Sequence, residues 1–256
     1  MAIYAIGDPH LSLVVNKPMD VFGPRWAGHT VRFLQNWEAT VGPEDIVLVP
    51  GDISWGMTIE EALPDLQEID RLPGRKLMVQ GNHDYWWQSL KKLRELPLST
   101  ISFIQNDAVL LPEGCVPGVA GPVAVCGTRG WITPGDRSWA DDPEHNEKIY
   151  LREVGRLKLS LEAGRKAGAA AFVVMLHYPP VADDHAPTGF TDLLEGWGNV
   201  LVCVYGHLHG PSASLRALQG VHRGIRYQLV ACDALDFTPV SLFPEGRDVT
   251  AADGLC

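Results

Sequence analysis

The sequence predicts an α/β domain, and three observations lead to this prediction. Short apolar runs alternate with stretches of helical period in the first hundred residues, which is typical of parallel strands joined by right-handed helical crossovers. Several of these runs end in turns rich in Asp, Asn or His. No repeat, low-complexity tract or linker divides the 256 residues, a length that suits one large domain. We therefore expect a single domain over residues 1–256.

The alternation is clearest in the first hundred residues. Three apolar runs are the expected strands: residues 2–6, 46–49 and 77–80. Three stretches are the expected helices: residues 26–41, 58–72 and 87–96. Apolar residues recur every three or four positions in the first of these helices, and Thr58 and Glu61 are spaced as a capping box at the start of the second. This order predicts parallel strands that share one edge of a sheet.

The rest of the chain is less regular. Short strands are expected over residues 101–104, 109–111, 123–126, 171–176 and 200–205, and antiparallel strands over residues 213–218, 227–231 and 240–243. Helices are expected over residues 143–168 and 191–195. The polar, Gly-rich segment 127–142 lies between a strand and the long helix, where it is a candidate cap loop over an active site.

Composition narrows the class of partner. The formal net charge of −10 argues against non-specific binding to nucleic acid or to acidic membranes. The five cysteines include no C-x-x-C pair, so we expect free thiols in a reducing compartment. No apolar stretch has the length of a signal peptide core followed by a cleavage site or of a membrane span. These features predict a cytoplasmic protein, and they leave its oligomeric state open.

Five polar turns follow apolar runs, and they supply the candidate site. The candidate metal ligands in these turns are Asp8, His10, Asp52, Asn82, His177, His207 and His209. Carboxylate, amide and imidazole groups together suit divalent metal ions. Two ions about 3.5–4 Å apart can activate a water molecule and hold both the attacking and the leaving oxygen of a phosphoryl transfer.

A single Asp or His at the end of a strand is more often a helix cap or a solvated residue than a ligand. Here five of the nine histidines lie in the polar turns, which favours a metal site. The other four histidines are expected to be solvated: His29, His145, His185 and His222.

Taken together, the five turns resemble the five motifs of the calcineurin-like metallophosphoesterase superfamily, in the same order. They are Asp8-x-His10, Gly51-Asp52, Gly81-Asn82-His83-Asp84, His177 and Gly206-His207-x-His209. The resemblance implies a four-layer α/β/β/α sandwich of two mixed sheets with helices on both outer faces. It also implies two divalent ions, with manganese favoured and iron, zinc or magnesium as alternatives.

The resemblance assigns roles to individual residues. Asp8, His10 and His209 would hold one ion, Asn82, His177 and His207 would hold the other, and Asp52 would bridge them together with a hydroxide. His83 would stabilise or protonate the leaving group, and Asp84 would orient His83.

The chain departs from two better-known branches of this superfamily. Ile53-Ser54-Trp55-Gly56 follows Gly51-Asp52, where protein Ser/Thr phosphatases carry Asp-Arg-Gly, so a phosphoprotein substrate is disfavoured. No tyrosine stands where purple acid phosphatases place their iron ligand. The chain most resembles a bacterial group of predicted phosphohydrolases.

The expected function is metal-dependent hydrolysis of a small phosphomonoester or phosphodiester, and a nucleotide-like organic part is one option. The alternative is a non-catalytic binding scaffold built on the same fold. His83 is also a candidate substrate-binding residue, and Trp55, Trp86 and Arg129 are further candidates. The two tryptophans have a second interpretation as core residues, and Arg129 has one as a surface residue.

Overall fold

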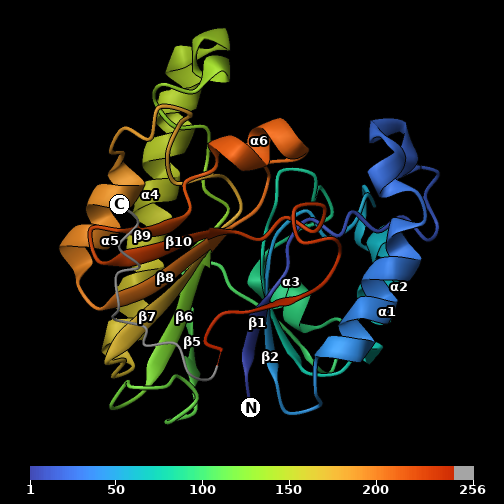
Figure 1. The fold of residues 1–256 in the computed structure, drawn as a ribbon, viewed down its shortest axis with the longest axis horizontal. Coiled ribbons are helices and arrows are strands. Elements are labelled where there is room, and N and C mark those ends of the chain that lie inside the picture. Colours follow the sequence, from blue (N-terminus) through green and yellow to red (C-terminus); the bar gives the residue numbers. More distant parts are fainter. Residues whose placement is uncertain (245–256) are drawn as a thin grey trace.

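The computed structural model describes residues 1–244. Two sheets pack face to face, and helices cover the outer face of each sheet (Figure 1). The predicted four-layer sandwich is confirmed. No helix in the described part of the chain is long and apolar enough to cross a membrane.

The first sheet has five strands in the order β11-β1-β2-β3-β4. Its parallel strands are β1 (Ile3–Ala5), β2 (Ile46–Pro50), β3 (Arg75–Val79) and β4 (Ile101–Phe103), and the antiparallel edge strand is β11 (Val240–Ser241). The four parallel strands therefore end at one edge of the sheet, as the alternation in the sequence predicts.

The second sheet has six strands in the order β5-β6-β7-β8-β10-β9. They are β5 (Ala108–Leu111), β6 (Val123–Thr128), β7 (Ala171–Leu176), β8 (Val200–Tyr205), β9 (Gly220–His222) and β10 (Ile225–Leu229). Strands β6, β7, β8 and β10 are parallel, and β5 and β9 are antiparallel edges. The carboxyl ends of β7 and β8 thus point in one direction.

Six α-helices and three 3₁₀ turns complete the described fold. The helices are α1 (His29–Thr40), α2 (Ile59–Arg71), α3 (Leu90–Arg94), α4 (Pro143–Lys166), α5 (Gly189–Trp197) and α6 (Pro211–Arg216). The 3₁₀ turns are η1 (Met19–Phe22), η2 (Pro24–Trp26) and η3 (Arg137–Asp141). Helices α1 and α2 lie outside the first sheet, and α4 and α5 lie outside the second (Figure 1).

One prediction for the C-terminal part is wrong, and another holds only in part. Residues 213–218 were expected to form a strand, but most of them lie in α6, which Pro211 opens at its first position. A proline there fixes a helical φ and loses no helical hydrogen bond. Residues 227–231 overlap β10, which pairs in parallel with β8 and only on its other side antiparallel with β9.

The N-cap of α2 is confirmed. The Thr58 hydroxyl accepts a hydrogen bond from the Glu61 N–H at 3.3 Å. In return, the Glu61 carboxylate accepts one from the N–H of Met57, one residue earlier than a capping box requires, at 2.8 Å. The helix continues through Pro64.

The core between the two sheets is aliphatic and closely packed. Leu77 and Val79 of β3 are fully buried in one cluster with Val173 and Met175 of β7. The four cysteines among the described residues are free and buried, as expected, and Cys256 lies outside the described residues. Because the sheets share this core, the positions of their strand ends relative to each other depend on it.

Leu77→Ala should lower the free energy of unfolding by about 2–5 kcal/mol, because it removes buried methyl groups and leaves a cavity. Chemical denaturation followed by circular dichroism measures the change. Leu151→Ala is the matched control, since Leu151 on α4 is 59% exposed, and it should change stability by no more than about 0.5 kcal/mol. Equal losses in the two variants would contradict the assignment of Leu77 to the inter-sheet core.

Candidate metal centre

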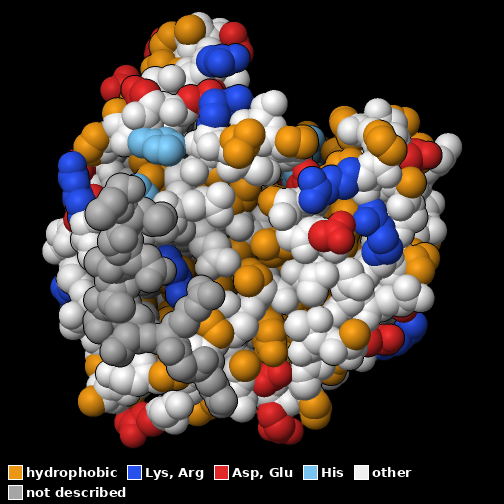
Figure 2. Space-filling model, viewed as in Figure 1, with side chains coloured by type: hydrophobic (Ala, Val, Ile, Leu, Met, Phe, Trp, Pro, Cys, Tyr) orange, Lys and Arg blue, Asp and Glu red, His pale blue; other side chains and the backbone are white. Residues whose placement is uncertain are grey.

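Backbone hydrogen bonds between neighbouring turns gather the polar residues at one edge of the sandwich. Asp8 N–H donates to the Gly51 carbonyl at 3.0 Å, and His10 N–H donates to the Asp52 carbonyl at 3.0 Å. On the second sheet, Gly206 N–H donates to the His177 carbonyl at 3.1 Å. At the top of the molecule the outline is indented between two projections, the segments that precede α1 and α4 (Figures 1 and 2).

Four of the predicted ligands lie on backbone in the left-handed region. The φ values are 56° for Asp8, 47° for His10, 51° for Asp52 and 70° for His207. Non-glycine residues rarely adopt this conformation, and such positions concentrate at functional sites. This conformation turns the chain sharply after each strand, so that the side chains converge.

The first group of side chains consists of Asp8, His10 and His209, whose ligand atoms could share one metal ion. His10 Nε2 lies 3.4 Å from His209 Nε2, and His209 Nε2 lies 3.8 Å from Asp8 Oδ1. Asp8 is fully buried and His10 is 3% exposed. Two imidazoles and one carboxylate therefore converge from opposite sheets.

The second group consists of Asn82, His177 and His207. Asn82 Oδ1 lies 2.6 Å from His177 Nε2 and 2.8 Å from His207 Nδ1. The two ring nitrogens are 3.3 Å apart. Together with Asp52, the two histidines form the second set of side chains that could hold an ion.

Asp52 lies between the two groups. Its Oδ2 is 3.7 Å from His10 Nε2 in the first group and 3.5 Å from His177 Nε2 in the second. Its Oδ1 accepts a hydrogen bond from the His83 N–H at 2.8 Å. The same carboxylate thus faces both groups while the third turn fixes its orientation.

The protonation states of these side chains suit the binding of metal cations. Burial lowers the pKa of His177 to about 3 and lowers the pKa of His10 and of His207 well below the usual value. Burial also raises the pKa of Asp52 to about 6, although the hydrogen bond from His83 N–H lowers it. Neutral imidazoles offer lone pairs, and buried carboxylates gain from a nearby cation.

The hydrogen bonds of the rings also fit metal ions. His177 Nδ1 is 3.0 Å from the Pro50 carbonyl, which only accepts, so Nδ1 carries the proton and Nε2 keeps its lone pair for the centre. Asp8 Oδ2 is buried and has no hydrogen-bond partner within the described residues. The donor set of oxygen and imidazole nitrogen atoms therefore fits two divalent cations.

Asp233 belongs to this site and was missed by the sequence analysis. Its Oδ1 lies 2.9 Å from His209 Nδ1, and its Oδ2 accepts a hydrogen bond from Gly210 N–H at 2.8 Å. Burial lowers the pKa of His209, but the hydrogen bond to Asp233 and the charge of Asp8 outweigh burial and raise it. A signal was present, because Asp233 follows an apolar run in the same way as the predicted ligands do.

His29 corrects another prediction. It was expected to be solvated, but its side chain is buried and its Nε2 donates to the His10 carbonyl at 3.3 Å. It lies on α1, which brings it against Trp26. The remaining three histidines outside the turns are exposed, as expected: His145, His185 and His222.

Asp84 does not orient the His83 ring, contrary to the prediction. Its Oδ1 accepts from the Ile53 N–H at 2.8 Å and from the Trp86 indole N–H at 3.1 Å, and its Oδ2 accepts from the Gly81 N–H at 2.7 Å. Burial and the charge of Asp52 raise its pKa to about 7. Asp84 therefore joins the turn after β3 to the turn after β2.

Trp86 packs away from the metal centre, so its prediction as a substrate-binding residue is wrong, whereas Arg129 pairs with a carboxylate of α4 and its binding role stays a prediction. The Trp86 side chain is 1% exposed and packs in the core outside the first sheet. The Arg129 guanidinium lies 4.0 Å from the buried Glu153 carboxylate and over the Trp131 ring. The backbone of Arg129 supports the site, because its carbonyl accepts from the His177 N–H at 3.0 Å.

Trp55 and His83 lie at the rim of the centre. The centroids of the two rings are 4.4 Å apart, and the Trp55 ring stacks on the His10 ring with a centroid distance of 5.0 Å. On the opposite side, the ring centroid of Tyr178 lies 4.2 Å from that of His207. Tyr178 also packs against Trp131 of segment 127–142. The centre thus has an aromatic residue on each side.

A family model decides the identity of the chain. The model of the calcineurin-like phosphoesterases matches residues 1–211, a range that contains all five polar turns. The chain belongs to the calcineurin-like phosphoesterase family. Asp233 lies beyond the matched range, so the support that it gives to His209 comes from the part of this phosphoesterase that the family model leaves out.

Two phage proteins and one solved structure are similar to this phosphoesterase. The Gene 66 protein of Mycobacterium phage D29 is 43% identical over 187 residues, which cover 72% of this chain and 68% of the phage protein. The Gene 66 protein of Mycobacterium phage L5 is 39% identical over 56 residues, 22% of this chain and 27% of that protein. The phosphopantetheinyl hydrolase PptH of Mycobacterium tuberculosis shares the fold, with a TM-score of 0.55 and 15% identity over 96% of each chain.

Asp233→Asn should weaken metal binding about 10- to 100-fold, because His209 loses the charged partner that raises its basicity. Isothermal titration of the metal-free protein with Mn²⁺ measures the effect. Asp236→Asn is the matched control, since the Asp236 side chain is 79% exposed and pairs with Arg32. Unchanged affinity in Asp233→Asn would remove Asp233 from the site.

Proposed function

We propose that this phosphoesterase hydrolyses a small phosphomonoester or phosphodiester with the help of two divalent cations, manganese first among them. The observation that carries the proposal is the position of Asp52, whose Oδ2 lies within 3.7 Å of one histidine group and 3.5 Å of the other. One carboxylate between two ligand sets is the arrangement that a dinuclear centre requires.

Each side chain then has a definite role. Asp8, His10 and His209 would hold one cation, and Asn82, His177 and His207 would hold the second, with Asp52 shared between them. When bound, the two cations supply a Lewis acid and an activated water molecule. Asp233 and the Pro50 carbonyl would keep the ring nitrogens of His209 and His177 directed toward the cations.

His83 is the proposed catalytic residue that does not hold a cation. Its backbone N–H donates a hydrogen bond to Asp52, and its ring packs against Trp55 at the rim of the centre. An imidazole in this place can donate a proton to the leaving oxygen or stabilise charge that develops on it. Asp84 would act as a positioning residue, because it holds the turn that carries His83.

The fold and the charge of the chain support a small substrate. A phosphopantetheinyl hydrolase with the same fold supports a hydrolytic reaction here without naming the substrate. The net charge of −10 disfavours polymeric nucleic acid. We also propose that segment 127–142 forms one wall of the cleft within a single domain, since Trp131 packs on Tyr178 beside His207.

His83→Ala should lower kcat about 10²- to 10⁴-fold, because the proton donor is lost. The assay uses 4-nitrophenyl phosphate and bis(4-nitrophenyl) phosphate with Mn²⁺-loaded protein. Metal content, measured by elemental analysis, should stay at the level of the unmodified chain, since His83 holds no cation. His222→Ala, at an exposed position, is the matched control and should retain full activity.

The same assay separates hydrolysis from the alternative of a binding scaffold. A chelated sample should lose activity together with His83→Ala. If the Mn²⁺-loaded chain hydrolyses neither ester faster than His83→Ala does, the proposed catalytic role is refuted. Bound metal without turnover, combined with a stable protein complex, would support the scaffold.

A further inference from the structure

A cavity of about 310 Å³ adjoins the candidate metal centre on the side of the first ligand group. His10 and His209 line this cavity as well as the centre, and His83 stands at its edge. A phosphoryl group held at the centre would therefore direct an attached organic group toward this space. The cavity has about twice the ~150 Å³ that admits benzene in an apolar protein interior.

The wall of the cavity comes mainly from the segment between β1 and α1. Met19 and Trp26 are 5% and 4% exposed, and they form the apolar floor. Phe22 is 66% exposed at the rim. Trp55 closes the side next to His83, and its indole N–H is already used in a contact with Met19 Sδ at 3.2 Å.

The cavity offers few hydrogen-bond partners. Among the described residues that line it, none carries a carboxylate, a carboxamide, a hydroxyl or a guanidinium group. A nucleobase placed here would find few partners for its polar edge, which costs free energy. An aromatic or alkyl group loses no hydrogen bonds and gains from leaving water.

We propose that this cavity binds an uncharged aromatic or alkyl group of the phosphoester substrate, in contact with Phe22, Met19 and Trp55. This inference rests on the proposed function, because it assumes that the phosphoryl group lies at the metal centre. It makes Phe22 a specificity-determining residue, and it separates this substrate class from nucleotides.

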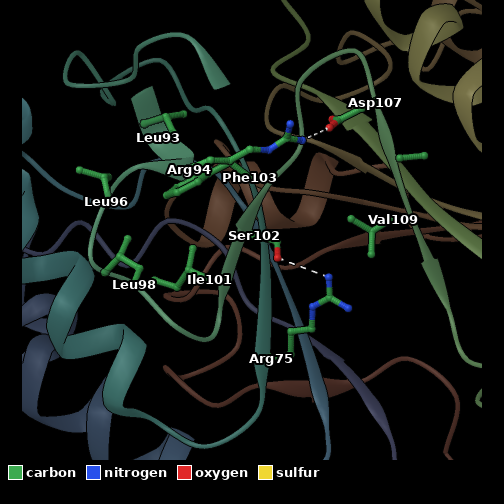
Figure 3. Close-up of a pocket in the computed structure, with 11 residues that line it drawn as sticks. Arg75, Leu93, Arg94, Leu96, Leu98, Ile101, Ser102, Phe103, Asp107 and Val109 are labelled. Atoms are coloured by element: carbon green, nitrogen blue, oxygen red, sulfur yellow. Dashed lines mark hydrogen bonds and ion pairs between the residues drawn. The ribbon is translucent and has the colours of Figure 1, made fainter. Parts of the chain in front are cut away.

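A second pocket, of about 260 Å³, lies between β4 and β5 and is a weaker candidate for the organic group (Figure 3). Both arginines that line it have partners within the chain. Arg94 pairs with Asp107 at 2.6 Å, and Arg75 Nη2 donates to Ser102 Oγ at 3.4 Å. None of its lining residues belongs to the metal centre.

The test is a series of phosphonates, which are not hydrolysed, titrated into Mn²⁺-loaded protein by calorimetry. The series comprises methylphosphonate, 2-naphthylmethylphosphonate and an adenine-bearing ethylphosphonate of similar size. We expect the naphthyl compound to bind at least about tenfold more tightly than the other two, because only its ring system is apolar.

Two variants locate the effect. Phe22→Ala should weaken binding of the naphthyl compound about three- to tenfold and leave methylphosphonate unchanged, because a single apolar wall is lost. Val21→Ala is the matched control, since Val21 is 72% exposed and is not among the described lining residues. It should bind all three compounds as the unmodified chain does.

Equal affinity for the methyl and naphthyl compounds, or tighter binding of the adenine compound, would overturn the inference. So would a naphthyl preference that Phe22→Ala leaves unchanged. Hydrolysis of the 4-nitrophenyl esters is measured in parallel on the same preparation. Loss of the naphthyl preference with hydrolysis intact refutes the cavity alone, whereas a preserved preference without any hydrolysis refutes the proposed function.

Discussion

The close approach of polar turns to buried carboxylates is the constraint on which the candidate site depends. A Cβ atom on Gly81 would lie 2.1 Å from the backbone nitrogen and from Oδ1 of Asp52, and one on Gly206 would lie 2.2 Å from Asp8 Oδ2. Any larger residue would push these turns away from the carboxylates. The glycines therefore let Asn82 come within reach of the second sheet.

The same packing buries several ionisable groups, and bound cations would reduce the free-energy cost of burying them. Burial raises the pKa of Asp8, Asp52 and Asp84, and it lowers the pKa of the ligand histidines that the sheets enclose. Such groups are costly to bury without partners. Hydrogen bonds from backbone N–H groups stabilise Asp84, and Asp233 gains from His209. The carboxylates inside the centre would depend more on the proposed cations.

The fold places different surroundings on the two sides of the centre. On the side of His10, the segment before α1 supplies an apolar cavity, which Trp55 also lines. On the side of His207, Tyr178 and Trp131 connect the centre to α4 through the Asn146 side chain, which accepts from the Trp131 indole N–H at 3.0 Å. The chemistry thus comes from the strand ends, whereas the shape of the cleft comes from the longer connections.

The sequence by itself determined the α/β class and the converging turns, because an apolar run followed by a polar turn is a local pattern. It did not determine contacts between distant parts of the chain. Asp233 meets His209 across 24 residues, Asp84 binds Ile53 across 31, and His29 reaches the His10 carbonyl across 19. Only the tertiary structure decided these contacts, since the way in which two sheets and their connections pack sets which distant side chains are buried together.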